Sequence, residues 1–358
     1  MQLVARICVL LFILGFSAAT DARVSAEPRY GTPGPVILIT VDGVRWQEIF
    51  EGEDPARTGG KPARTARELL PNLYEMVRQG GAFAGAPGQE PMRVSGPNFV
   101  SLPGYLELFS GAEADGCSNN DCPRTTSATL LDRADARGLR TAAFASWPVV
   151  SRALSARTDA NISAGLEAGS SVDPYPGLAG FRPDRLTAEQ ALTALMERRL
   201  DFLYVGFGET DEYAHRGDYA GYIQALRFAD AFVGEVRRYL AQADASNPGW
   251  GRSAHIIVTT DHGRAADFRN HGGGAPESQR TWLAAAGPQF RGGDFSRTSE
   301  PMYLRDVRPV VEDLLGLRRR GTSDGALAAG LFATPARWGI GTGARSSRRS
   351  SAAVTSGR

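Results

Sequence analysis

Short apolar segments that alternate with amphipathic stretches set the predicted architecture of this chain. The apolar segments are nearly continuous and rich in β-branched residues, a pattern typical of strands buried on both faces of a parallel sheet. They lie at residues 35–40 (PVILIT), 139–145, 201–207, 255–260 and, as a fifth candidate, 281–287. Helical patterns lie between them at residues 65–79, 127–137, 187–199, 219–241 and 303–316. This alternation predicts an α/β fold with a mostly parallel central sheet and helices on both faces.

The two ends of the chain differ from this pattern. Arg6 precedes an apolar run from Ile7 to about Ala19 and then small residues, which is the layout of a secretory signal peptide at about residues 1–26. The run of roughly a dozen residues is short for a membrane span, although an uncleaved anchor is the alternative. Residues 336–358 lack apolar periodicity and are expected to form a disordered tail. One domain at residues 27–335 and export to the periplasm or the medium are therefore predicted.

Composition narrows the possible partners. The 358 residues carry 40 basic and 39 acidic side chains, so no net field draws the chain to nucleic acid or to a membrane surface. No nucleic-acid groove and no stable membrane span after signal cleavage are expected. Lys61 is the only lysine, and its surroundings (GGKPA) lack the pattern of a phosphate-binding P-loop. Partners must therefore be sought in a local site.

The cysteines fit an exported protein. Cys8 lies in the predicted signal peptide, which leaves Cys117 and Cys122 as an even pair in CSNNDC. Such a pair in an exported chain predicts a short-loop disulfide, with two free thiols as the alternative.

Four stretches at or after the predicted strands concentrate residue types that bind metals. Three of the four histidines of the chain fall within them. Carboxylates that follow buried strands at one edge of a sheet are costly unless a cation or partner receives them. Imidazole and carboxylate together suit Zn²⁺ first and Mn²⁺ as an alternative. The stretches are VDGVR with Asp42, NFVSLPGY with Ser101, GETDEYAH with Asp211 and His215, and TTDHGRAADFRNH with Asp261, His262 and His271.

In this order, the four stretches resemble those of the alkaline phosphatase superfamily of metal-dependent phosphoesterases and sulfatases. Within it, the chain is most similar to the nucleotide pyrophosphatase/phosphodiesterase branch, from about Pro35 to Leu317. Three further segments carry this likeness: PNLYEMVRQGG after the first strand, SWP at residues 146–148, and MYLRDVRPVVEDLLGL near the end.

The resemblance implies an alkaline phosphatase-like fold and a site with two divalent ions about 4 Å apart. One ion would be held by Asp211, His215 and His271, and the other by Asp42, Asp261 and His262. Ser101 would bridge both ions as the nucleophile and form a phosphoserine intermediate that is then hydrolysed. Pro103 suits a first helical turn, so Ser101 is expected at a helix N-terminus, where the N–H of Leu102 is the candidate donor to the phosphoryl group. Asn120 is the candidate side-chain contact to it, with Asn119 as the alternative one residue away.

The chain departs from this branch at two points. The branch has threonine as the nucleophile and an Asn-His pair after the proline, whereas this chain has Ser101, Gly104 and Tyr105. A sulfatase needs an arginine two residues after that proline, which SLPGY lacks. We therefore expect a hydrolase of phosphoric esters, with diesters or nucleotide pyrophosphates favoured. The alternatives are a phosphomonoesterase, then a sulfatase, and a non-catalytic binding module with the same fold.

Taken singly, these residues have simpler explanations. Asp211 alone would be a helix N-cap, His215 a solvated helix face and Ser101 a capping serine. Trp147 fits packing as well as it fits a wall for a leaving group, and Asp230 is expected to be structural. Four arginines are candidates for contacts to a substrate anion, and none of them stands out: Arg93, Arg124, Arg216 and Arg264.

Overall fold

The computed structural model describes residues 34–114, 116–158, 160–167, 180–246, 248–290, 300–318 and 326–331. These residues belong to one compact unit that begins at Pro33. The predicted signal peptide (1–26) and the predicted tail (336–358) lie outside the described residues, so the predicted domain boundaries stay predictions. Within the described ranges, no helix combines the length and the apolar composition needed to cross a membrane.

A seven-stranded sheet forms the centre of this unit, with the strand order β2-β9-β7-β1-β6-β4-β5. The central strand β1 pairs in parallel with both β6 and β7, whereas β9 runs antiparallel to β7 and β2. The predicted α/β fold with a mostly parallel sheet is thus confirmed. The strands are β1 (Val36–Val41), β2 (Gly81–Ala84), β4 (Thr141–Ala145), β5 (Ile162–Ala164), β6 (Phe202–Phe207), β7 (His255–Thr259) and β9 (Leu283–Ala286). A small second sheet contains β10 (Met302–Tyr303), β3 (Met92–Arg93) and β8 (Arg280–Thr281).

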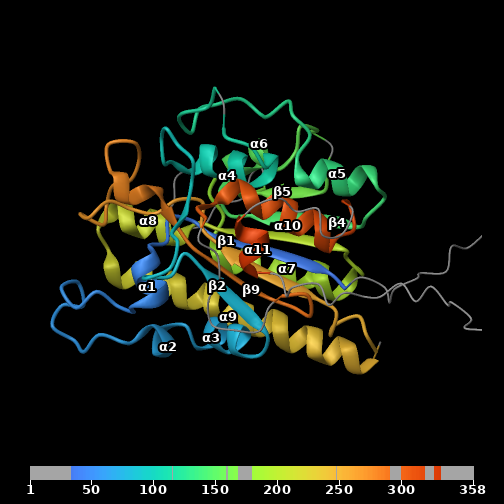
Figure 1. The fold of residues 1–358 in the computed structure, drawn as a ribbon, viewed down its shortest axis with the longest axis horizontal. Coiled ribbons are helices and arrows are strands. Elements are labelled where there is room, and N and C mark those ends of the chain that lie inside the picture. The colour runs from blue at the N-terminus through green and yellow to red at the C-terminus, as the bar shows by residue number, and fades with distance from the viewer. Residues whose placement is uncertain are drawn as a thin grey trace, which may run out of the picture. The chain divides into compact units, whose positions relative to one another are not determined.

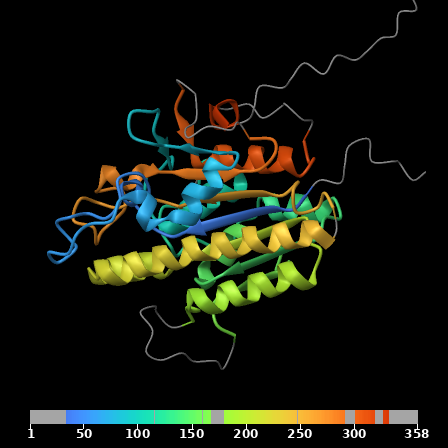
Figure 2. The ribbon, with the colours of Figure 1, turned by 90° about the horizontal axis from the view of Figure 1, so that it is seen from below.

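Side chains of β1 alternate between two hydrophobic cores, as expected for a strand covered on both faces. Val36 and Leu38 enter one core, and Ile37 and Ile39 enter the other. The first core is covered by α4 (Ser101–Ser110), α5 (Leu130–Ala136), α6 (Ser151–Leu154), α10 (Val307–Leu314) and α11 (Ala326–Leu331). The second is covered by α1 (Trp46–Phe50), α3 (Pro71–Arg78), α7 (Asp184–Glu197) and α9 (Tyr219–Ser246). Figure 1 shows these two helical layers above and below the sheet, and Figure 2 shows α7 and α9 side by side along the strands.

The predicted helix at residues 65–79 is in fact two helices. Thr65 forms a capping box with Glu68 at the start of α2 (Ala66–Leu69), and Pro71 begins α3. Pro71 cannot continue α2 because it has no backbone N–H group to donate. Its fixed backbone angle φ suits the first position of a new helix. Two strands of the central sheet, β2 (GAFA) and β5 (ISA), were not predicted because both are short, and β2 begins at Gly81, in a pair of glycines that is typical of a helix end.

Asp230 of α9 caps the N-terminus of α3 from another part of the chain. Its Oδ1 accepts a hydrogen bond from the N–H of Leu73 (2.8 Å), and its Oδ2 accepts from the N–H of Asn72 (3.2 Å). The Nδ2 of Asn72 also donates to Oδ2, over 2.8 Å. Asp230 is buried, so these contacts join the helix pair α3–α9 and give Asp230 the structural role expected of it.

We predict that Asp230→Ala lowers the free energy of unfolding by about 1–3 kcal/mol, because buried N–H groups of α3 lose their acceptor. Asp230→Asn keeps one carbonyl acceptor and should cost less. Glu189→Ala, on the exposed face of α7, is the matched control and should change stability by less than about 0.5 kcal/mol. Urea denaturation measures all three variants, and equal stability of Asp230→Ala and the control would refute the capping role.

Candidate metal and nucleophile site

Three neighbouring strands deliver the candidate ligands to one edge of the sheet. Asp42 directly follows β1, and Asp261 lies just beyond the end of the adjacent β7. The helix α8 (Glu209–Arg216) follows β6, the other neighbour of β1, and carries Asp211 and His215. Because the three strands are parallel, their carboxyl ends meet, as the sequence predicted. Asp184 fixes the start of α8 by accepting the N–H groups of Gly208 (2.9 Å) and Glu209 (3.1 Å).

Asp211, His215 and His271 form the first group of candidate ligands, with ligand atoms all within 4.8 Å of one another. Oδ2 of Asp211 and Nε2 of His271 each lie 3.0 Å from Nε2 of His215. Nδ1 of His271 lies 3.1 Å from the carbonyl oxygen of Phe99, which can only accept a hydrogen bond. Nδ1 therefore carries the proton, and Nε2 presents its lone pair to the centre of the group. Such an arrangement fits a cation.

The second group whose ligand atoms all lie within 4.8 Å of one another is Asp42, Asp211 and His262, so Asp211 belongs to both groups. Asp261, the third residue predicted for the second ion, lies beside Asp42 and His262, and these three are called the second group below. Nε2 of His262 lies 3.6 Å from Oδ1 of Asp42 and 3.4 Å from Oδ2 of Asp261. Nδ1 of His262 donates to the carbonyl of Gly263 (2.8 Å), which again leaves Nε2 as the lone-pair atom. Oδ2 of Asp261 is buried and has no hydrogen-bond partner among the described residues. An orphaned carboxylate oxygen that faces an imidazole lone pair fits a metal ion better than it fits a folded core without one.

Electrostatics within the second group point the same way. Burial, followed by the charges of Asp261 and Asp211, raises the pKa of Asp42 well above its usual range. Burial likewise raises the pKa of Asp261 to about 7. For the histidines, burial lowers the pKa of His262 to about 4 and that of His271 to about 3. These two imidazoles are therefore neutral, which is the ligating form, whereas the hydrogen bond with Asp211 raises the pKa of His215. The buried carboxylates of Asp42 and Asp261 need a nearby positive charge to be ionised.

Asp211 differs from the other carboxylates because Arg264 supplies a positive charge. Burial alone would raise the pKa of Asp211, but Arg264 and the two histidines beside it hold that pKa well below its usual range. The buried Arg264 pairs with Oδ1 of Asp211 and donates through Nε to the carbonyl of Phe268 (2.6 Å). A Cβ on Gly43 would lie 2.4 Å from Oδ1 of Asp211 and 2.6 Å from Nη1 of Arg264. The glycine of VDGVR therefore makes room for this ion pair.

The roles of the other candidate arginines also become clearer. Arg124 donates to the carbonyl groups of Ser151 and Ser155, which is a structural role rather than a substrate contact. Arg264 contacts a candidate ligand, Asp211, through an ion pair that no spacing in the sequence signals.

Ser101 is the first residue of α4 and is buried beside the second group. Its Oγ lies 3.1 Å from Nε2 of His262 and 3.4 Å from Oδ1 of Asp42. A Cβ on Gly104 would lie 2.4 Å from the carbonyl oxygen of Asp261, so glycine lets the first turn of α4 pack directly against that backbone. The hydroxyl of Tyr105 donates to Oδ2 of Asp42 (3.0 Å). The Gly-Tyr pair, which departs from the family pattern, therefore has a physical reason at this site.

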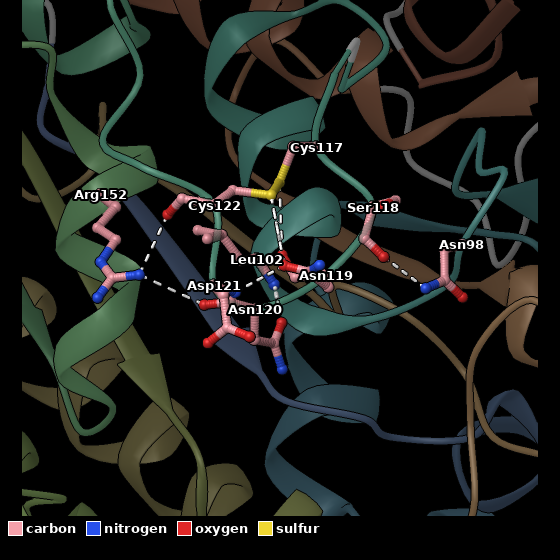
Figure 3. Close-up of a disulfide and its surroundings, with 9 residues drawn as sticks. All are labelled: Asn98, Leu102, Cys117, Ser118, Asn119, Asn120, Asp121, Cys122 and Arg152. Carbon is pink, nitrogen blue, oxygen red and sulfur yellow. Dashed lines mark hydrogen bonds between the residues drawn. A yellow bond between two sulfur atoms is a disulfide. The ribbon is translucent and has the colours of Figure 1, made fainter.

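The two expected phosphoryl contacts bond to each other in this structure. The N–H of Leu102 donates to Oδ1 of Asn120 (2.9 Å), and Asn120 sits in a loop closed by the predicted disulfide between Cys117 and Cys122. Figure 3 shows the loop above the start of α4, with Nδ2 of Asn120 pointing away from Leu102. The backbone of Asn119 lies in the same loop, but it is Asn120 that reaches α4.

A cavity of about 310 Å³ opens onto both groups. Its lining includes Ser101 and Asn120 together with the side chains of Trp147, Phe181 and Glu212. Trp147 follows β4, so a fourth neighbouring strand contributes to the same edge. No arginine or lysine is among the described residues that line the cavity. The structure thus brings the residues predicted for the site to one edge of the sheet, and it shows contacts of Tyr105 and Arg264 there that the sequence did not predict.

The chain matches the model of the metalloenzyme superfamily at residues 123–282, a range that contains five of the candidate ligands but not Asp42 or Ser101. Two curated 2,3-bisphosphoglycerate-independent phosphoglycerate mutases are similar over shorter segments. The one from Moorella thermoacetica is 26% identical over 152 residues, 41% of this chain and 27% of the mutase. The one from Halobacterium salinarum is 27% identical over 143 residues, 38% of this chain and 25% of the mutase. The chain therefore spans about a quarter of the length of these relatives.

Solved structures share the fold over most of the chain. A putative sulfatase from Bacteroides thetaiotaomicron has a TM-score of 0.56 and 13% identity, covering 82% of this chain and 73% of that one. The lipoteichoic acid synthase LtaP from Listeria monocytogenes has a TM-score of 0.55 and 11% identity, with 80% and 73% covered. Murine ectonucleotide pyrophosphatase/phosphodiesterase 5, in complex with AMP, has a TM-score of 0.54 and 11% identity, with 83% and 100% covered.

We predict that Asp261→Asn stabilises the metal-free protein at neutral pH while it weakens metal binding. The pKa of Asp261 is about 7 in the folded protein and about 3.9 in an unfolded chain. The unfolded chain therefore loses this proton first, and the free energy of unfolding falls as the pH rises from about 4 to about 7. Asparagine has no proton to release, so the variant avoids this fall in the free energy of unfolding. The Tm of the variant should exceed that of the wild type by a few degrees at pH 8, and the difference should shrink toward pH 4.

Thermal unfolding in a chelator measures this effect, and isothermal titration with Zn²⁺ measures metal binding. Glu197→Gln, an exposed carboxylate at the end of α7, is the control and should leave both quantities unchanged. If Asp261→Asn lowered the Tm of the metal-free protein at pH 8, the burial of an unpaired charge would be refuted.

Proposed function

Because the chain shares a sequence match and a fold with the alkaline phosphatase-like metalloenzyme superfamily, we propose that it is a metal-dependent hydrolase of phosphoric esters. The observation that carries this proposal is the place of Ser101. Its Oγ lies within 3.4 Å of Oδ1 of Asp42 and Nε2 of His262, at the start of a helix and on the wall of the cavity. A hydroxyl in that position faces the ligand atoms that would hold a cation.

Two divalent ions, Zn²⁺ first and Mn²⁺ as the alternative, fit the two groups. Asp211, His215 and His271 would hold one ion, and Asp42, Asp261 and His262 the other. When bound, such ions neutralise negative charge on a transferred group and favour the ionised form of a nearby hydroxyl. The lone-pair tautomers of His262 and His271 and the orphaned Oδ2 of Asp261 support this assignment.

The residues of the chain supply position and orientation. Tyr105 holds Asp42 through its hydroxyl, and the first turn of α4 holds Ser101 against the backbone of Asp261. Once ionised, Oγ of Ser101 forms a bond to phosphorus while the bond from phosphorus to the leaving oxygen breaks. Water then cleaves the phosphoserine, which releases phosphate or a phosphate monoester and restores the hydroxyl. The N–H of Leu102 donates to Oδ1 of Asn120 in this structure, so this N–H group could contact an anionic oxygen of the substrate directly only if that bond opened.

The cavity favours diesters or nucleotide pyrophosphates over monoesters. A monoester dianion is usually bound by arginine or lysine, and the described lining contains neither. Trp147 and Phe181 offer apolar and aromatic surface for the second ester group. A phosphomonoesterase is the rival within the same chemistry. The similarity to phosphoglycerate mutases adds phosphoryl transfer between two hydroxyls as a second rival.

The layout of residues 1–26 supports export, so we propose that the enzyme acts in the periplasm or outside the cell. Its substrate would be a small phosphate ester or nucleotide that is present there.

We predict that Ser101→Ala lowers kcat by roughly 10³-fold or more, because the covalent route is lost. Bound metal should stay near the wild-type content, since Ser101 contributes only one of the ligands on each ion. Ser110→Ala, at the other end of α4, is the control and should keep normal turnover. Acid quenching during turnover, followed by mass spectrometry, should find a phosphoryl group on the peptide that contains Ser101. Near-normal kcat in Ser101→Ala would refute the assignment of the nucleophile.

We also predict that a chelator abolishes turnover and that Zn²⁺ or Mn²⁺ restores it. A panel of a nucleotide diester, a nitrophenyl phosphate, a nitrophenyl sulfate and a phosphoglycerate separates the rivals. Faster hydrolysis of the diester, measured as kcat/KM, is the expected result. The highest kcat/KM on the monoester would favour a phosphomonoesterase, and isomerisation of the phosphoglycerate would favour a mutase. Without metal-dependent activity on any member of the panel, the fold would serve as a binding module.

A further inference from the structure

We propose that Arg152 and the disulfide between Cys117 and Cys122 are positioning groups that set Asn120 over the start of α4. In this arrangement, Nδ2 of Asn120 is the side-chain donor that orients a substrate oxygen beside Ser101. The inference rests on the proposed function, and it gives Arg152 and the disulfide a positioning role that neither the sequence nor the comparisons assign.

A hydrogen bond holds the side-chain amide of Asn120 in one orientation. Its Oδ1 accepts the N–H of Leu102 (2.9 Å), and a carboxamide whose oxygen is held in this way presents its NH₂ group to the other side. Asn120 lines the cavity together with Ser101, and Figure 3 shows Nδ2 directed away from Leu102 and from the disulfide. The bond to Leu102 thus decides which end of the amide meets the substrate. A rotated amide would place an NH₂ group against an N–H group, which repels it.

The loop that carries Asn120 is largely exposed. Of its described residues, Cys117 is buried, whereas Ser118, Asn119 and Asp121 are exposed. A loop with so little apolar packing has few contacts to offset the entropy of ordering it. Its conformation therefore depends on covalent and polar restraints.

The disulfide, Arg152 and Asn98 restrain this loop. The disulfide closes the loop around Asn120, and Nη1 of Arg152 donates to the carbonyl oxygens of Cys122 (3.1 Å) and Asn120 (3.4 Å). The N–H of Thr125 donates back to the carbonyl of Arg152 (3.0 Å), so the chain beyond the loop is tied to the same residue. On the other side, Nδ2 of Asn98 donates to the carbonyl of Ser118. Figure 3 shows Arg152 and Asn98 on opposite sides of the loop.

Arg152 and the candidate nucleophile Ser101 lie on two helices that pack together. Arg152 lies on α6, which packs against α4, and α4 begins with Ser101 and Leu102. The helix pair therefore supports both the nucleophile and the loop that bends over it. Arg152 itself is not among the residues that line the cavity, so it acts through Asn120 rather than on the substrate. One guanidinium nitrogen serves two carbonyl groups, a geometry that a lysine ammonium on a flexible stem reproduces less well.

The test is a double-mutant cycle on the metal-loaded enzyme with the diester substrate. Arg152→Ala should lower kcat/KM about tenfold, less than the roughly 10²-fold that a 1 Å misplacement of a reacting group can cost. Asn120→Ala should lower it at least as much. In the Asn120→Ala background, Arg152→Ala should then change kcat/KM by less than about twofold, because nothing is left to position. Arg152→Lys should recover part of the loss.

The same cycle applies to the pair Cys117→Ser with Cys122→Ser, which avoids thiol reagents that bind Zn²⁺. Arg140→Ala, an exposed arginine paired with Asp201 before β4, is the matched control and should leave kcat/KM within about twofold. Metal content and Tm of every variant identify a failure to fold. If the losses from Arg152→Ala and Asn120→Ala multiply in folded, metal-loaded protein, the positioning role is refuted.

Failure of the proposed function has a different signature. In that case Ser101→Ala or a chelator would leave turnover intact, whatever the outcome of the cycle. Loss of turnover in both of those experiments, together with multiplying losses in the cycle, would refute the positioning role alone.

Discussion

Two buried carboxylates at the carboxyl ends of adjacent strands are the constraint on which the site depends. Asp42 follows β1 and Asp261 follows β7, and burial raises the pKa of each. Neither has an ion pair with a lysine or arginine among the described residues. Arg264, a buried arginine at this edge, is engaged with Asp211. These two carboxylates therefore lack a lysine or arginine partner among the described residues. A cation from outside the chain could supply the missing positive charge, as a metal centre requires.

The segment just before and at the start of α4 connects these charges to the rest of the site. Asn98 donates to the carbonyl of Ser118 and accepts the N–H of Gly273, so it joins the disulfide loop to the loop of His271. The carbonyl of Phe99 orients the ring of His271, and Ser101 faces Asp42. Because Gly104 lets α4 rest on the backbone of Asp261, these contacts share one rigid support. A displacement of α4 would move the nucleophile and a candidate ligand together.

The sequence predicted the parts of the site that depend on the ends of strands. A run such as PVILIT is visible as a buried strand, and a carboxylate directly after it must emerge at the sheet edge. This reasoning located Asp42 and Asp261, and the i, i+4 spacing placed Asp211 and His215 on one face of α8. The same reasoning predicted the alternation of strands and helices but missed β2 (GAFA) and β5 (ISA), which are too short to show a strand pattern.

The contacts that the sequence did not predict cross between elements that are distant in the chain. The pairing of Arg264 with Asp211 and the hydrogen bond from Tyr105 to Asp42 depend on which way each side chain points after the helices have packed. Abundance also hid Arg264, because 40 basic residues offer many equivalent candidates. Asn120 was found only through the family likeness, and its bond to Leu102 became visible only when the loop and α4 were in place.

The candidate ligands and the other residues that line the cavity are held by different parts of the fold. The candidate ligands lie at the ends of strands and on α8, where backbone pairing in the sheet fixes them within a rigid core. Asn120 and Phe181 instead come from connecting segments, and Trp147 from the turn after β4. Changes in these segments can alter the contacts to a leaving group without moving the metal ligands. Solved structures with this fold include a putative sulfatase, a lipoteichoic acid synthase and an ectonucleotide pyrophosphatase/phosphodiesterase, so the fold alone does not specify a substrate. Under the proposed function, substrate choice would then depend on the loop held by Arg152 more than on the sheet edge that carries the candidate ligands.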